Sequence, residues 1–222
     1  MCQCCDFFLT RRLLFFCVRV GVCVQVGVRG LAGSDGADQR IHAVRGVLHH
    51  AGSDQVAPDS AFASQQEADD WLNTMSARLQ KRIPNASNRM DFLKTVHYEA
   101  IRAGLDPQLV LGLIQVESGF RKYAVSSAGA RGYMQVMPFW VKEIGAKQHN
   151  LFHLRTNLRY GCTILRHYLD IEKGNIYRAL GRYNGSLGKP DYPNLVKSVW
   201  QKHWGIPQRT SSSAAPQGSQ QF

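Results

Sequence analysis

Cysteine is scarce in most of this 222-residue chain, because five of its six cysteines lie within the first 23 positions. The sixth, Cys162, is the only cysteine beyond them. A lone cysteine excludes a disulfide framework or a zinc site of paired cysteines in the rest of the chain. Cys162 stands at helical spacing between Leu158 and Leu165, which predicts a buried core thiol.

Acidic residues are also few. Asp and Glu number 16 against 27 Lys and Arg, which gives a formal charge of +11 and a pI near 9.6. Such a surface favours a polyanionic neighbour, which can be a nucleic acid, an anionic membrane or an acidic cell-wall polymer. The chain has no helix-turn-helix spacing, no aromatic RNA-binding strand and no paired-cysteine zinc pattern, so we expect no nucleic-acid partner.

Strand-like alternation is nearly absent and no internal repeat is visible, which argues against a β-sandwich, a barrel or a solenoid. Helical signals are frequent instead. A capping box at Ser64-x-x-Glu67 begins one helix, a second ends near Gly104, and a third has Asp106 as N-cap and Pro107 at its first position. Further helices are predicted over residues 156–171, 176–182 and 194–204. The predicted fold class is therefore mainly α, or at most α+β with a small β part.

The predicted domain runs from 64 to 205. Residues 1–32 resemble a secretory signal, with an apolar stretch behind Arg11 and Arg12, or they come from an overextended start codon. Residues 33–63 are predicted to be a linker, and residues 206–222 a polar, disordered tail.

One carboxylate stands out in the predicted third helix. Glu117 ends the apolar run "LGLIQVE", beside Val116 and one turn after Leu113. Apolar neighbours and the carbonyl groups at a helix C-terminus both disfavour an ionised carboxylate, so its pKa should be raised. A raised carboxyl pKa is what a general acid needs near neutral pH, although a surface Glu at a helix end would give the same local pattern.

The residues that follow Glu117 carry a resemblance. "ESGFRKYAVSSAGARGYMQVMP" resembles the catalytic motif of the soluble lytic transglycosylase family, relatives of goose-type lysozyme. Later blocks agree in order, through Asn157 and Gly161, Tyr183 and Asn184, and Tyr192 and Val196. The resemblance covers residues 91–204. The chain departs from the family at Arg182, where Ala is usual, at Gly185-Ser186, where Ala-Gly is usual, and at Pro193.

The resemblance implies a lysozyme-like, single catalytic domain that cleaves the β-1,4 bond between N-acetylmuramic acid and N-acetylglucosamine and leaves 1,6-anhydromuramoyl ends. Glu117 would be the single general acid and base. Substrate contacts would come from six matched residues: Ser118, Met134, Gln135, Tyr183, Asn184 and Tyr192. No cofactor and no metal are expected.

Glycosidases usually pair two carboxylates, and no second one lies in a motif block. Asp170 and Glu172 look like solvated charges at a helix end, and Glu143 and Asp191 also lie outside the blocks. If the substrate's own hydroxyl and acetamido groups complete the reaction, one carboxylate suffices.

The expected partner is the glycan strand of peptidoglycan, with the protein a monomer that is exported to the periplasm or cell envelope and associates peripherally with the envelope or membrane. Two alternatives stay open. One is a hydrolytic muramidase of lysozyme type, in which water replaces the sugar hydroxyl. The other is a wall-binding module without turnover.

Overall fold

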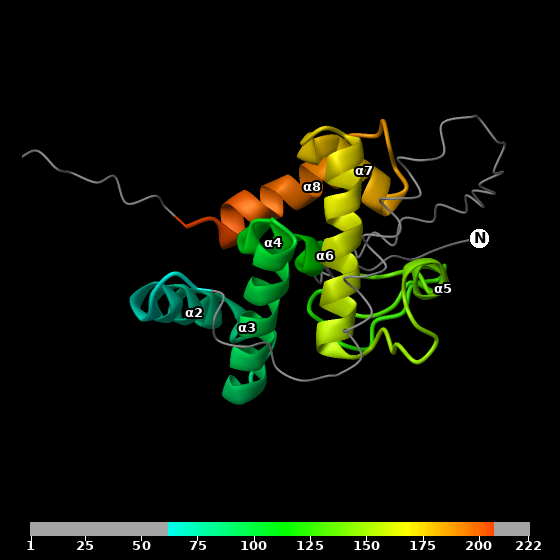
Figure 1. Cartoon of the computed structure of the whole chain (residues 1–222). Coiled ribbons are helices and arrows are strands. Elements are labelled where there is room, and N and C mark those ends of the chain that lie inside the picture. The colour runs from blue at the N-terminus through cyan, green and yellow to red at the C-terminus, as the bar shows by residue number, and fades with distance from the viewer. Residues whose placement is uncertain (1–61, 207–222) are drawn as a thin grey trace, which may run out of the picture. The chain divides into compact units, whose positions relative to one another are not determined.

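The computed structural model describes residues 62–206 as a helical domain (Figure 1). The signal-like segment 1–32, the linker up to 61 and the tail from 207 onward lie outside these described residues. The helices are α2 (Gln65–Leu79), α3 (Ala86–Arg102), α4 (Pro107–Glu117), α5 (Phe139–Ile144), α6 (Leu154–Ile171), α7 (Ile176–Asn184), α8 (Asp191–Val199) and a π-helix at Trp200–Trp204. Within residues 62–206 no strand forms, and the only β-pairing is two isolated bridges at Arg131. The mainly α prediction is confirmed.

The helix starts follow the predicted chemistry. The Ser64 hydroxyl caps α2 by accepting from the Glu67 backbone N–H at 3.1 Å, and the Glu67 carboxylate accepts from the Ala63 N–H. Asp106 caps α4 through the Gln108 N–H at 2.7 Å, and Pro107 is the first helical residue. These caps satisfy N–H groups that have no partner inside the helix.

Some boundaries differ from the prediction. Helix α6 begins at Leu154 rather than 156, and α7 extends to Asn184 rather than 182. The last predicted helix, 194–204, is α8 from Asp191 followed directly by the π-helix. The six-residue α5 was not predicted, because its few residues are too short for a helical period to be recognised.

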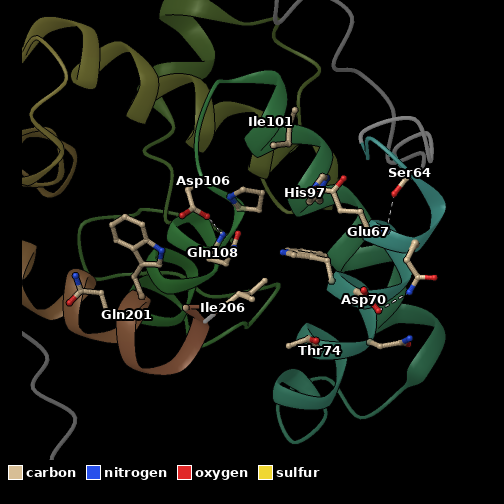
Figure 2. Close-up of a pocket in the computed structure, with 16 residues that line it drawn as sticks. Ser64, Glu67, Asp70, Thr74, His97, Ile101, Asp106, Gln108, Gln201 and Ile206 are labelled. Atoms are coloured by element: carbon tan, nitrogen blue, oxygen red, sulfur yellow. Dashed lines mark hydrogen bonds between the residues drawn. The ribbon is translucent and has the colours of Figure 1, made fainter. Parts of the chain in front are cut away.

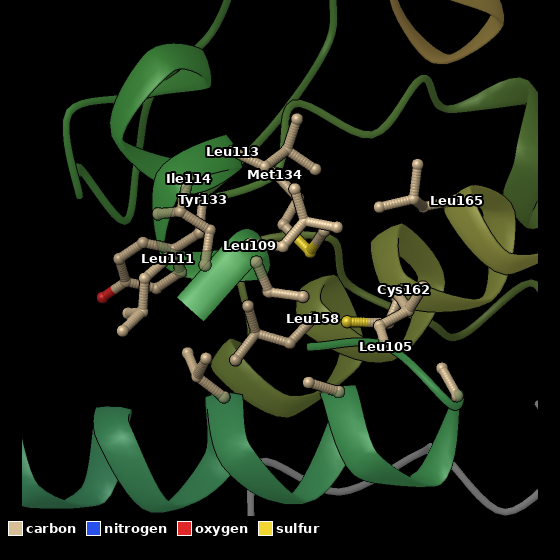
Figure 3. Close-up of a cluster of buried hydrophobic side chains, with 14 of the residues drawn as sticks. Leu105, Leu109, Leu111, Leu113, Ile114, Tyr133, Met134, Leu158, Cys162 and Leu165 are labelled. Carbon is tan, nitrogen blue, oxygen red and sulfur yellow. The ribbon is translucent and has the colours of Figure 1, made fainter. Parts of the chain in front are cut away.

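The core is one continuous cluster of apolar side chains. Helix α3 lies between α2 and α6 in Figure 1, and α4 packs on α3, α8 and the π-helix. Figure 3 shows leucines of α4 meeting Leu158, Cys162 and Leu165 of α6. These three α6 side chains are fully buried, as their spacing predicts, and Cys162 is a free thiol.

A buried carboxylate joins α3 to α6. The Glu99 side chain is 0% exposed and accepts from Arg159 Nη2 at 2.9 Å, Arg102 Nε at 2.7 Å and Arg155 Nε at 3.4 Å. A charge inside a protein is tolerated only when it is paired and hydrogen-bonded, so these arginines stabilise both the carboxylate and the contact between the two helices.

We expect Glu99→Ala to lower the free energy of unfolding by about 3–5 kcal/mol, because it leaves arginines buried without their counter-charge. Asp170→Ala is the matched control, since it breaks the Arg166–Asp170 pair on the surface of α6 and should cost less than about 1 kcal/mol. Urea denaturation of both variants measures the difference. Equal losses would mean that the cluster around Glu99 contributes nothing beyond an ordinary surface ion pair.

Candidate active site

Glu117 is the last residue of α4, where the sequence placed it. Its side chain is partly buried. Desolvation raises the pKa of its carboxyl to about 7, against an ordinary value of 4.5. The raised pKa predicted from the apolar neighbours is therefore confirmed. At neutral pH about half of such carboxyls hold a proton, which a general acid can donate.

Tyr192 is the hydrogen-bond partner of this carboxyl. It lies on α8, which packs against α4, and its hydroxyl donates to Glu117 Oε1. The hydrogen bond favours the ionised carboxylate and so opposes the effect of desolvation on the pKa of Glu117. Desolvation, with the neighbouring Glu117, holds the pKa of Tyr192 well above its usual value, so the phenol keeps its proton.

Tyr183, which is expected to contact the substrate, has a hydrogen-bond partner within the protein. Its hydroxyl donates to the Met134 carbonyl at 2.8 Å. The charge of Glu117 still acts on it, after desolvation, to raise the pKa of Tyr183. Tyr183 therefore lies near the carboxyl and ties α7 to the loop that follows α4.

That loop, residues 118–138, holds Gln135 in an uncommon conformation. Gln135 has a positive φ of 49°, and its Nε2 donates to the carbonyls of Gly132 at 2.8 Å and Ala124 at 3.1 Å. Both amide hydrogens are thus used within the loop. Only the acceptor Oε1 of this side chain is left for the expected substrate contact.

Two of the side chains predicted to contact substrate are buried. The Met134 side chain is 0% exposed and belongs to the core, and Ser118 is 2% exposed, with its hydroxyl donating to the Ile114 carbonyl at 3.2 Å. Both side chains are therefore closed to solvent in this structure. Ser118 ends α4, and Met134 supports the loop from beneath.

Asn184 is exposed at the last position of α7. Gly185 follows in the left-handed conformation, with φ of 76°, and caps the helix. Among the described residues no hydrogen bond joins Asn184 to Glu117 or Tyr192, so the structure leaves Asn184 at the surface beyond Tyr183.

Asn157 is a site residue to which the sequence assigned no role. Its Oδ1 accepts from the Met134 N–H, and its Nδ2 donates to the carbonyls of Arg131 and Leu151, each at 2.8 Å. Gly132 leaves room for this amide, because a Cβ there would lie only 2.8 Å from Asn157 Cγ. In the sequence, Asn157 was indicated only by its match to a family motif, and such a match does not reveal which groups the side chain contacts.

The carboxylates considered as partners for Glu117 are engaged elsewhere or exposed. Asp170 is paired with Arg166 in an exposed contact, as a solvated helix-end charge would be. For Glu172 the prediction of a solvated charge is wrong. Its side chain is only 7% exposed and accepts from both Arg178 and Arg182. Arg182, which departs from the family pattern, thereby pairs with the carboxylate that follows α6.

Glu143 and Asp191 are exposed. Within residues 62–206, no other carboxylate contributes to the pKa shift of Glu117, whose causes are desolvation and Tyr192. In the same part of the chain, no cluster of three or more His, Cys, Asp or Glu side chains is arranged to hold a metal ion, and no helix is both long and apolar enough to span a membrane.

Tyr192→Phe should raise the pKa of Glu117 further, because it removes the hydrogen bond that favours the ionised form while keeping the ring that excludes water. Tyr183→Phe is the matched control, since its hydroxyl bonds to Met134 instead. Carbon-detected NMR titration of the Glu117 carboxyl measures both variants. A pKa in Tyr192→Phe at or below the wild-type value would contradict the assigned contact.

Comparison with known proteins matches the part of the chain that contains this site. A family model described as the transglycosylase SLT domain matches residues 94–193. A transglycosylase of Enterobacteria phage PRD1 is 31% identical over 112 residues, which are 50% of this chain and 41% of that protein.

Membrane-bound lytic murein transglycosylase C of Actinobacillus pleuropneumoniae is 51% identical over 47 residues, which are 21% of this chain and 13% of that protein. The protein of the same name from Haemophilus influenzae is 39% identical over 61 residues, 25% of this chain and 17% of its own. The chain thus spans less than half the length of these relatives. The matched segment includes α4, the loop, α6, α7 and Tyr192, and on this basis the chain carries a transglycosylase SLT domain.

Proposed function

We propose that the protein is a peptidoglycan lytic transglycosylase that cleaves the β-1,4 bond between N-acetylmuramic acid and N-acetylglucosamine. The observation that carries the proposal is the Glu117 carboxyl, held near neutral pKa at the end of α4 by desolvation. The SLT domain match and the names of the relatives support the same reaction and substrate class.

In the proposed reaction Glu117 first gives its proton to the glycosidic oxygen, and the bond from that oxygen to C1 of the muramoyl residue breaks. The C6 hydroxyl of the same sugar then attacks C1, and its proton passes to the Glu117 carboxylate. A 1,6-anhydro ring and a free 4-hydroxyl result, no water is consumed, and Glu117 is protonated again.

The isolation of Glu117 favours this route over one with two carboxylates. A second carboxylate near the first would raise its pKa by repulsion, yet desolvation is the only cause that raises the pKa of Glu117. With no second carboxylate acting on Glu117 among residues 62–206, the proposed nucleophile comes from the substrate or from water. Tyr192 would hold the carboxyl in place while the proton leaves and returns.

Among the other matched residues, Gln135 offers its Oε1 to a hydroxyl or N-acetyl N–H of the sugar, and Asn184 offers an exposed amide at the end of α7. Tyr183 would act through Met134, by fixing the loop that carries Gln135. Ser118 and Met134 would support the site without touching the glycan.

The charge of the surface suits an anionic wall. Arg131 of the loop, with Lys142 and Lys147, lines a cavity of about 800 Å³ that has no Asp or Glu in its lining. Lactyl and stem-peptide carboxylates of peptidoglycan would be attracted there. Together with the signal-like residues 1–32, this supports a site of action in the cell envelope.

Digestion of purified sacculi tests the function. Wild-type protein should release muropeptides with 1,6-anhydromuramoyl ends, detected by mass spectrometry. Glu117→Gln should lower the rate about 100- to 10,000-fold, the usual contribution of a general acid. Glu143→Gln, an exposed glutamate of α5, is the matched control and should keep the wild-type rate. Reducing muramic ends would assign a hydrolytic muramidase, and no release by wild-type protein would assign a wall-binding module.

The rate should also depend on pH in a stated direction. Because the acid must be protonated, kcat/KM should fall as pH rises through about 7, the pKa of Glu117. In Tyr192→Phe the fall should move to higher pH, since that variant keeps the carboxyl protonated for longer. Activity that increases as Glu117 ionises would contradict its role as the acid.

A further inference from the structure

A second hollow lies at the other end of α4, away from Glu117. Its volume is about 1400 Å³. Figure 2 shows Ser64, Glu67, Asp70 and Thr74 of the α2 region on one side, and Asp106, Gln108, Gln201 and Ile206 on the other. We call this the α2–α4 groove. The SLT domain match begins at residue 94, so α2 and the residues after 193 lie outside it.

The groove has the opposite charge to the rest of the chain. Glu67, Asp70 and Asp106 line it, and no Lys or Arg does, although the chain has 27 basic residues against 16 acidic ones. These three carboxylates are exposed, so they stay available to a ligand. A concave surface lined by one sign of charge raises the local concentration of ligands of the opposite sign.

Two buried ring nitrogens in the lining have no hydrogen-bond partner. Trp71 is 7% exposed and His97 is 6% exposed, and neither Trp71 Nε1 nor His97 Nδ1 forms a hydrogen bond with any group of residues 62–206. Nearly all buried polar groups in proteins are paired, so such a pair of unpaired nitrogens points to a ligand that supplies hydrogen bonds.

His97 carries no positive charge that would repel a basic ligand. Burial lowers its pKa to about 4, which outweighs the opposite effect of Glu67, so the ring is neutral at physiological pH. The Phe62 ring stacks on it with centroids 3.6 Å apart, and Trp71 meets it edge-on at 4.9 Å. The two nitrogens therefore belong to a fixed aromatic cluster.

The rim of the groove is apolar as well as acidic. Ile101 is 49% exposed and Ile206 is 42% exposed, and both line it together with Trp200. A ligand that covered these side chains would gain from their removal from water. The groove thus combines exposed apolar side chains, negative charge and unpaired donors or acceptors.

We propose that the α2–α4 groove binds a basic peptide segment of a partner protein. Lys or Arg side chains of the segment would meet Glu67, Asp70 and Asp106, its apolar side chains would cover Ile101 and Ile206, and its backbone carbonyls would accept from Trp71 Nε1. The volume is larger than that of most small-molecule sites, which are about 300–1,000 Å³.

Glycan is the less suitable ligand, because lactyl and stem-peptide carboxylates would be repelled by the three acidic side chains. The site is also separate from the proposed chemistry. Helix α4 runs eleven residues from Pro107, in the groove, to Glu117, which is about 15 Å at the helical rise. The inference does not depend on peptidoglycan cleavage.

The test uses the full chain and two amidated octapeptides, one of alternating Lys and Leu and one of alternating Glu and Leu. The indole N–H signals of the four tryptophans report binding by nitrogen-15 NMR. The basic peptide should shift the Trp71 signal, assigned with Trp71→Phe, and leave that of Trp140, which is outside the lining, in place. Added salt should weaken the binding.

Charge neutralisation gives a matched pair of variants. Glu67→Gln/Asp70→Asn/Asp106→Asn removes three charges but keeps groups able to accept the capping bonds and the bond from Gln66 Nε2 to residue 70. It should weaken peptide binding at least about tenfold, or 1.4 kcal/mol. Asp69→Asn is the control, because the Asp69 carboxylate accepts a similar hydrogen bond from Gln65 Nε2 but lies outside the lining. This variant should bind the basic peptide as tightly as the wild type.

Four results would overturn the proposal. In the first, the basic peptide binds the triple variant as tightly as the wild type, and in the second, the acidic peptide binds the wild type as tightly as the basic peptide does. In the third, soluble peptidoglycan fragments shift the Trp71 signal and the basic peptide does not. In the fourth, sedimentation analysis finds a dimer that the triple substitution dissociates. The third would assign the groove to glycan, and the fourth to a second copy of this chain.

Discussion

The site depends on a carboxyl group that is partly buried at the end of a helix, where it is desolvated. Desolvation of Glu117 favours its neutral form, and the hydrogen bond from Tyr192 favours the ionised form. The balance of these two effects puts the pKa near neutral pH, where the group can both give and take a proton. Both effects require α8 to pack against α4, so the helix contact sets the acidity of the site.

The loop after α4 gains its form from residues that do not touch Glu117. The buried side-chain amide of Asn157 on α6 binds two backbone groups of the loop, at Arg131 and Met134, and one outside it, at Leu151. The Tyr183 hydroxyl on α7 binds one more loop group, the Met134 carbonyl. Such contacts explain how Gln135 keeps a positive φ, which costs energy for a residue with a side chain. The conformation of the loop is thus set by α6 and α7, and rigid support of this kind keeps a site in its working geometry.

The two ends of α4 have different surroundings. Its C-terminal residue is the carboxyl with a raised pKa, and its N-terminal turn lines a groove with acidic and apolar side chains. A basic surface directs the protein as a whole toward anionic material, whereas the groove attracts cationic groups. One short helix therefore connects a candidate catalytic site with a candidate partner site of opposite preference.

The sequence by itself determined what depends on neighbours within a few turns. The caps at Ser64 and Asp106, the buried face of α6 and the position of Glu117 at a helix end all follow from local spacing, because hydrogen bonds and side-chain contacts in a helix join residues three or four apart. Tertiary structure decided which tyrosine meets the carboxyl. Tyr192 lies 75 positions from Glu117, and no local pattern distinguishes it from Tyr183. The same holds for the arginines around Glu99, the pairing of Arg182 with Glu172, and the burial of Ser118 and Met134. Each of these depends on how whole helices pack, and helix packing is a property of the folded chain rather than of any short segment.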